Sequence, residues 1–126
     1  MSKPVLAAQL YTIRQFVKDI EGVRESLKKV RDIGYTAVQI SGFGPVDPAE
    51  VARIVEDLDI NIAATHMSWD RFLNDLDGVI VDHKLWKCTH SAIGGLFTDE
   101  YKCAAGVNRF LGEFETVVER LSLIHI

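Results

Sequence analysis

The sequence is poor in the features that mark several classes of protein. It has two cysteines, Cys88 and Cys103, which are too few for a disulfide framework or the paired CxxC spacing of a structural zinc site. No apolar run approaches the roughly 18 residues of a membrane span, and the N-terminus lacks the pattern of a signal peptide. Lys and Arg number 14 against 18 Asp and Glu, which argues against a nucleic-acid or anionic-membrane partner. We therefore expect a cytoplasmic, one-domain protein with no nucleic acid and no membrane among its partners.

The sequence does contain short apolar runs that alternate with amphipathic stretches. The apolar runs predict four strands, at residues 5–11, 37–41, 60–66 and 90–94. Apolar residues at helical spacing predict four helices, around residues 23–33, 51–58, 72–83 and 107–118. Each strand start follows the last by about the length of a βαβ unit, roughly 30 residues.

Local capping signals support the first two helices. Asp19 is placed to cap the first helix, and Gly34 follows its last apolar residue as a C-terminal glycine would. Asp47, Pro48 and Glu50 are a cap, a first-turn proline and an acidic third residue in the expected order. Both helices should therefore begin and end close to these residues.

Strands that alternate with helices predict a parallel sheet with right-handed crossovers. Two architectures fit: an open doubly wound sheet, or the first four βα units of a (β/α)8 TIM barrel. A complete barrel needs about 250 residues, so four units are half of one. Gln9 and Gln39 place a polar side chain near the end of two neighbouring strands, which suits a barrel lumen. We therefore expect an α/β fold, an incomplete barrel of parallel strands with outer helices.

The last six residues, 121–126, match what one reading frame of a common transposase library adapter encodes. We expect residues 1–120 to be the N-terminal half of a TIM-barrel domain and residues 121–126 to be a non-native, adapter-derived tail. A tail of this kind is left out of fold and function arguments. The alternative is a natural helix that ends in apolar residues.

Four motifs resemble one known family. Residues 8–14 (AQLYTIR) resemble the opening strand of the sugar phosphate isomerase/epimerase family, the xylose isomerase-like TIM barrels. Residues 32–42, 63–66 and 92–95 resemble its next three strand regions, and the third ends in a histidine that this family often shows. The motifs occur in the family's order, so the resemblance covers nearly all of residues 5–120, the N-terminal half of such a barrel.

The resemblance implies an enzyme of carbohydrate metabolism that removes a proton next to the carbonyl of a sugar or polyol. It also implies a divalent metal, Mn, Mg, Co or Zn, held by Glu, Asp, His and Glu at the ends of later strands. Those ligands and the acid/base glutamates belong to the second half of the barrel. The catalytic residues are therefore unknown here, no metal ligand is expected in this fragment, and the fragment alone should be inactive.

The resemblance and the positions of polar side chains at strand ends suggest five substrate-binding candidates. His66 ends the third strand, where it can contact a substrate hydroxyl or simply bridge strand and loop. Gln9 and Gln39 can bind sugar hydroxyls or form a buried amide network. Tyr11 can stack on a sugar or only pack at the rim. Trp69, in the loop after the third strand, can shield the reacting carbons or cover the third helix.

Other residues suggest functions less well. His83, Cys88, His90 and Cys103 are spread over helix, strand and loop, which does not suit a zinc site. Gly42 and Gly44 are interpreted as turn residues. The related endonuclease IV branch needs a histidine where this sequence has Gly94 and Gly95, so DNA repair is disfavoured.

Three alternatives to an isomerase or epimerase differ in how well the sequence fits them. An inosose-type dehydratase shares the fold, the metal and the proton abstraction, and the sequence does not separate it. A non-catalytic half barrel that pairs with a second copy would make the chain a homo-oligomer. A flavodoxin-like receiver needs acidic residues where this chain has His66 and Tyr11, so it fails on chemistry.

Overall fold

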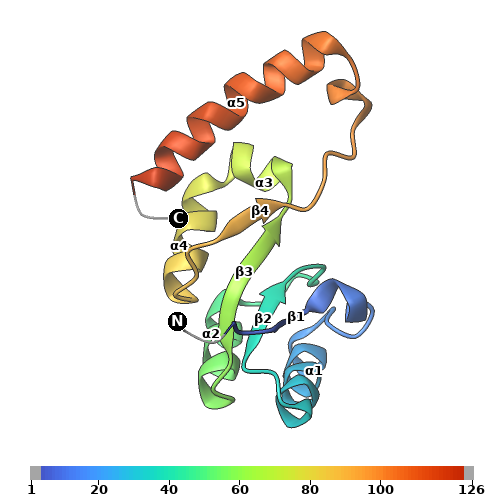
Figure 1. The fold of residues 1–126 in the computed structure, drawn as a ribbon, viewed down its shortest axis with the longest axis vertical. Helices are drawn as coiled ribbons and strands as arrows, with labels where there is room; N and C mark the ends of the chain where they lie inside the picture. The colour runs from blue at the N-terminus through green and yellow to red at the C-terminus, as the bar shows by residue number, and fades with distance from the viewer. Residues whose placement is uncertain (1–3, 124–126) are drawn as a thin grey trace.

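A computed structural model describes residues 4–123 and shows an α/β fold on one four-stranded sheet (Figure 1). The three neighbouring strand pairs are parallel, and the strand order is β1-β2-β3-β4. The order of a doubly wound sheet reverses at a switch point, and these four strands show no reversal. Their bounds are Ala7–Gln9 for β1, Ala37–Ile40 for β2, Asn61–Met67 for β3 and Ser91–Ile93 for β4.

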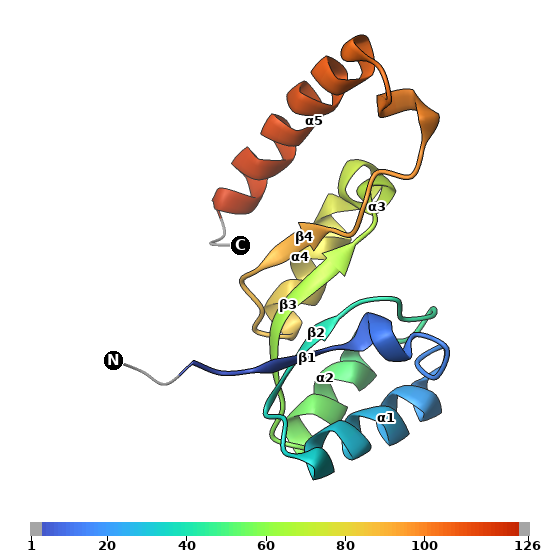
Figure 2. The ribbon, with the colours of Figure 1, turned by 45° about the vertical axis from the view of Figure 1, so that its right-hand side comes forward.

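The contacts between helices run from α1 to α2, from α2 to α4, from α4 to α3 and from α3 to α5. This order indicates one helical layer that follows the sheet, with α5 beyond α3 at the end opposite α1 (Figures 1 and 2). No helix in residues 4–123 is long and apolar enough to cross a membrane. The bounds are Ile20–Ile33 (α1), Pro48–Asp57 (α2), Trp69–Asn74 (α3), Leu76–Leu85 (α4) and Ala104–Ser122 (α5), with 3-10 turns Leu10–Ile13 (η1) and Asp99–Tyr101 (η2).

The predicted caps of α1 and α2 are confirmed. The Asp19 carboxylate accepts a hydrogen bond of 2.8 Å from the amide of Gly22, and Asp47 accepts one of 2.9 Å from Ala49. Gly34 ends α1 with φ at 114°, in the left-handed region that favours glycine. These local contacts satisfy backbone groups that a helix end leaves free, which is why sequence alone located them.

The first strand is shorter than predicted, because it ends at Gln9 and not at Tyr11. The side chain of Gln9 accepts a hydrogen bond from the Tyr11 amide at 3.2 Å, and the Thr12 hydroxyl donates to the Gln9 carbonyl at 2.8 Å. These contacts turn the chain into η1. Tyr11 therefore lies in a 3-10 turn at the mouth end of the sheet and not in a strand.

The predicted third helix, around residues 72–83, is two helices. Asp75 has φ −142° and ψ 44°, which is outside the helical region, and it separates α3 from α4. Its carboxylate holds the Arg71 side chain at 3.1 Å. At Gly78 in α4, a Cβ would lie 2.3 Å from the Asp75 carboxylate, so glycine makes room for this break.

The apolar core lies between the sheet and the helices. Val38 in β2 and Leu27 in α1 are fully buried, as are Val51 of α2 and Val79 of α4. The side chains of a strand alternate between its two faces, so the opposite face carries a different set. That face presents Gln9, Gln39, Ala64 and His66.

The α5 helix leaves an apolar stripe exposed, which predicts self-association. We expect the sedimentation coefficient of the chain to rise with protein concentration, because exposed apolar patches favour contacts between copies. Replacing Leu111 and Val118 with Lys should reduce this rise, and Val81→Lys on α4 serves as the control. An unchanged concentration dependence in the α5 double variant would contradict the prediction. The stripe consists of Val107, Leu111, Phe114 and Val118.

Candidate functional site

The candidate site lies at the carboxyl ends of the strands, which a parallel sheet brings to one edge. Gln39 of β2 pairs in register with Gln9 of β1 on one side and with Ala64 of β3 on the other. His66 follows Ala64 by two residues, so its side chain shares their face. The structure thus brings together three of the five predicted substrate-binding residues.

The two glutamines form the predicted amide pair. Gln9 Nε2 donates a hydrogen bond to Gln39 Oε1, and Gln9 Oε1 accepts from the Tyr11 amide. Both ends of the Gln9 side chain are therefore used within the protein. Gln39 Nε2 makes no hydrogen bond inside residues 4–123, so it is the donor that remains for a ligand.

His66 has one partner and one free ring nitrogen. The buried Ser41 hydroxyl, just after β2, lies 3.3 Å from Nδ1 of His66. Within the described residues, Nε2 of His66 has no protein partner. Because the ring is held from one side by Ser41, its other nitrogen can exchange a hydrogen bond with a bound hydroxyl or carbonyl.

Tyr11 lies beside the loop that follows β2. A Cβ at Gly42 would lie 3.0 Å from Cδ2 of Tyr11, and Gly42 has φ at 73°. The guanidinium of Arg14 stands 4.4 Å above the Tyr11 ring, whose residue is 52% exposed. Gly44 lies close to the backbone of another segment, since a Cβ there would lie 2.1 Å from the Lys18 carbonyl oxygen. Both glycines allow a close approach of the chain, as their interpretation as turn residues required.

A pocket of about 400 Å³ opens next to His66, between the ends of β3 and β4. A volume of this size falls within the range of small-molecule sites. We call it the His66 pocket. Its wall combines apolar side chains with a few polar ones, which is the usual make-up of a ligand site. The residues that line it are Ser41, His66, Met67, Ser68, Trp69, Asp70, Leu73, Gly94, Gly95, Leu96, Phe97, Thr98, Glu100 and Tyr101.

Trp69 is not in a loop, as the sequence suggested, but is the first residue of α3. It is 7% exposed, and its ring packs edge-on against Phe110 of α5 with centroids 4.9 Å apart. Its Nε1 donates to the Tyr101 hydroxyl at 2.9 Å, which donates to Glu113 at 3.0 Å. Trp69 therefore joins α3 to α5 and also forms part of the pocket wall.

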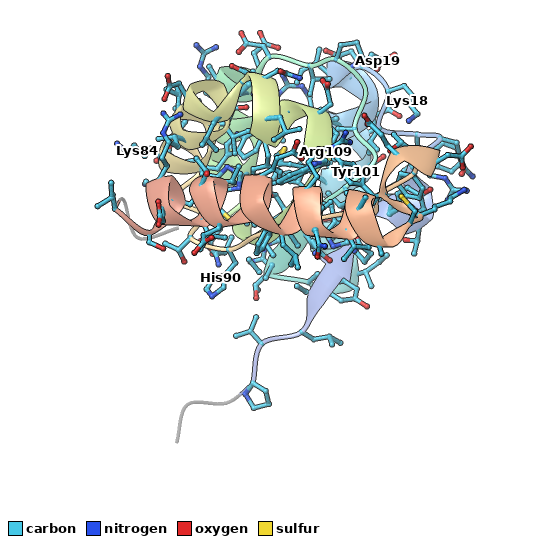
Figure 3. All side chains as sticks on the ribbon, turned by 90° about the horizontal axis from the view of Figure 1, so that it is seen from above. Lys18, Asp19, Lys84, His90, Tyr101 and Arg109 are labelled. Atoms are coloured by element: carbon cyan, nitrogen blue, oxygen red, sulfur yellow. The ribbon has the colours of Figure 1, made fainter. Side chains whose placement is uncertain are left out.

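The sequence did not predict most residues that line the His66 pocket. Phe97, Glu100 and Tyr101 lie in the segment between β4 and α5, where barrel enzymes place ligand contacts. Figure 3 labels Tyr101 beside Arg109, whose guanidinium stands 5.1 Å from the centre of the Tyr101 ring. Their position after a strand could have marked them as candidates for ligand contact. The alternation of apolar and polar residues, however, does not show which residues of a loop point into a pocket.

The side chains of His83, Cys88, His90 and Cys103 do not form one cluster. Burial raises the pKa of the Cys88 thiol, which donates to the His90 carbonyl at 3.3 Å. His83 is buried under the sheet, and the His90 side chain points away from Tyr101 and Arg109 (Figure 3). No three His, Cys, Asp or Glu side chains within residues 4–123 are grouped so that they could hold a metal ion.

The geometry offers a pocket at the carboxyl edge of a parallel sheet, lined by the His66 imidazole and by aromatic side chains, and the amide of Gln39 lies outside its lining on the same sheet face as His66. Such groups can bind a small polar molecule through its hydroxyls and its carbon face. A comparison with protein-family models and with curated proteins finds no match for this chain. Its function is therefore inferred from the site and from the sequence motifs that surround it.

Proposed function

We propose that this chain is the N-terminal half of a metal-dependent isomerase or epimerase of sugars or sugar phosphates, built on a (β/α)8 barrel. One observation carries the proposal: His66 lies near the carboxyl edge of a parallel sheet, on the same face as Gln39, and lines a pocket of about 400 Å³. In barrel enzymes the active site lies at that edge. The motifs of residues 8–14, 32–42, 63–66 and 92–95 add the resemblance to this family.

The topology supports the barrel. Strands in chain order, with the helical part of each βα unit in contact with that of the next, are what four consecutive βα units of a barrel require. Both outer edges of the sheet, at β1 and β4, lack a strand partner among the described residues. A closed barrel would provide that partner on each side, and it would also cover part of the exposed stripe on α5.

In this proposal the chain binds and orients the substrate. Nε2 of Gln39 donates a hydrogen bond to a hydroxyl or carbonyl oxygen of the sugar, and Nε2 of His66 exchanges one with a sugar hydroxyl. Ser41 holds the His66 ring through Nδ1 at 3.3 Å, which leaves Nε2 available to a ligand in the pocket that His66 lines. The aromatic wall covers the carbon face of the sugar and keeps water away from it.

The residues present do not by themselves fit a divalent metal, since residues 4–123 group no three ligand side chains. The family's ligands, Glu, Asp, His and Glu, would come from strands that this sequence does not contain. We therefore assign no chemical step to a metal on this chain. Proton abstraction would likewise use a base from that second half.

The test is the exchange of a substrate proton with solvent. The coding sequence that contains residues 1–120 should be recovered from an independent library and its whole product expressed. With ketoses in deuterated water, an isomerase or epimerase incorporates deuterium next to the carbonyl, which NMR detects. A dehydratase would instead release water and form a new product, so the same spectra separate the two activities.

Site variants of that product test the role of His66. His66→Asn should lower kcat/KM by about 10- to 100-fold, because it removes a substrate hydrogen bond. His90→Asn is the matched control, since His90 is exposed and precedes the amino end of β4. Absence of exchange on every sugar tested, or full activity of His66→Asn, would contradict the proposal.

A further inference from the structure

We infer that the His66 pocket takes the unphosphorylated carbon chain of a neutral sugar or polyol and rejects a phosphate ester. This inference rests on the proposed function and narrows its substrate class. It follows from the charges that line the pocket, from the pairing of the nearby cations, and from the aromatic side chains of its wall.

The charged side chains of the pocket are acidic. Asp70 and Glu100 line it, and no Lys or Arg of residues 4–123 does. A phosphate ester carries one to two negative charges at neutral pH. The Asp70 carboxylate repels such a group, and Glu100 already holds Arg109 at 2.8 Å, whereas a hydroxyl can donate hydrogen bonds to both carboxylates. The pocket therefore favours a ligand with hydroxyls and no charge.

The cations closest in sequence to the pocket already have acidic partners. Arg71 bonds Asp82 at 2.7 Å, and Arg109 bonds Glu100 at 2.8 Å. Lys102 pairs with an acidic neighbour in the same turn, Asp99. A phosphate would have to displace a carboxylate from one of these cations, which costs the existing pair.

The amino end of α3 does not replace the missing cation as a phosphate-binding group. The helix is six residues long, and its first turn contains the negative charge of Asp70, whose carboxylate accepts a hydrogen bond of 2.8 Å from the Asn74 side chain. The Ser68 hydroxyl accepts a hydrogen bond from the Arg71 amide at 3.2 Å. The backbone donors of this turn are thus partly satisfied, and a second negative charge would meet the first.

The rest of the wall suits the carbon face of a sugar. Trp69, Phe97 and Tyr101 contribute aromatic surface, and Leu73 and Leu96 add aliphatic surface. Phe97 is 88% exposed, and a Cβ at Gly95 would lie 2.4 Å from its ring, so the absence of a side chain there lets Phe97 lie over the pocket rim. The C–H groups of a sugar pack against such surfaces, and its hydroxyls reach the polar groups.

A pair of ligands that differ by one phosphate tests the inference. The chain should be titrated with D-fructose and with D-fructose 6-phosphate, and binding followed by NMR through the indole N–H signal of Trp69. A Trp86→Phe variant identifies which of the two indole signals belongs to Trp69. We expect D-fructose to shift this signal, and D-fructose 6-phosphate to bind roughly tenfold more weakly. Added salt should reduce the difference in affinity between the two ligands, because it screens the repulsion between the phosphate and the carboxylates of the pocket.

Two neighbouring carboxylates provide a matched comparison. Glu100→Gln removes a charge from the pocket wall, so it should increase the affinity for D-fructose 6-phosphate relative to D-fructose. Asp99→Asn removes the same charge one residue away, outside the pocket lining, and should leave the ratio near that of the parent. Both side chains are exposed, so neither change should unfold the chain.

The outcomes separate the inference from the proposed function. Weaker binding of the phosphate ester, with relief in Glu100→Gln, supports both. Equal or tighter binding of D-fructose 6-phosphate overturns the inference and leaves a sugar site in place. If neither ligand shifts the Trp69 signal, the result contradicts both the sugar site of the proposed function and the inference that rests on it.

Discussion

Replacing Arg71 with leucine is expected to lower the free energy of unfolding by about 3 kcal/mol. Arg71 in α3 bonds the Asp82 carboxylate of α4 at 2.7 Å, and that carboxylate is 8% exposed. Burial lowers the pKa of Arg71, but its hydrogen bonds to Asp82 and Asp75 raise it above the ordinary value overall. The leucine variant leaves the Asp82 charge buried without a partner, which costs more than the pair itself contributes.

Urea denaturation followed by circular dichroism measures the loss in free energy of unfolding. Two further variants test its cause. The double variant Arg71→Leu with Asp82→Leu should recover most of the stability, because it removes the unpaired charge as well. Arg24→Leu is the control, since Arg24 and Glu21 form an exposed pair at 4.0 Å. It should change stability by less than about 0.5 kcal/mol. A double variant no more stable than Arg71→Leu would contradict the account.

Acid is expected to destabilise the chain through His83, with the loss starting as the pH falls below about 6.5. The His83 ring is fully buried, and its Nδ1 lies 2.7 Å from the Val79 carbonyl, which only accepts. Nδ1 therefore carries the proton, and Nε2 accepts from the Thr65 hydroxyl at 2.7 Å. Thr65 in turn accepts from Ser91 at 2.9 Å. This chain of bonds needs the neutral ring.

The direction of the pH effect follows from the pKa of His83. Burial lowers this pKa, and Arg71 adds to the lowering, whereas the bond to Val79 and the charge of Asp82 oppose it. The unfolded chain therefore binds the proton at a higher pH than the folded chain does. Stability is complete above the unfolded value and decreases as the pH falls through the folded one.

The pH dependence of urea denaturation between pH 7 and pH 5 tests this role. His83→Phe should lower the free energy of unfolding by about 2 kcal/mol at pH 7, because it removes the buried acceptor of the Thr65 hydroxyl and the ring N–H that donates to the Val79 carbonyl. Its stability should then change less with pH than that of the parent. His90→Asn, at an exposed histidine, should keep the parent's slope. An identical slope in His83→Phe would contradict the assignment.

Part of the candidate site could be predicted from the sequence. His66, Gln9 and Gln39 follow from the alternation of side chains along strands and from the shared carboxyl edge of a parallel sheet. Tyr11 was placed at the correct end but in the wrong element, since the Gln9 side chain ends the strand early. Trp69 was placed in a loop, although Ser68 caps a helix there with a 3.2 Å bond to Arg71.

The sequence by itself determined the alternation of strands and helices and the caps of α1 and α2, because those signals are local. Asp19, Gly34 and Asp47 mark helix ends through bonds to residues two to four positions away. Only the tertiary structure decided the pocket and the polar contacts beneath the sheet. Glu100 and Tyr101 line the same pocket as His66. His83 is hydrogen-bonded to Thr65, which is hydrogen-bonded to Ser91. These residues come from chain segments that no local rule relates. Such contacts depend on how the strands pair and how the helices pack, and short-range periodicity does not encode those distances.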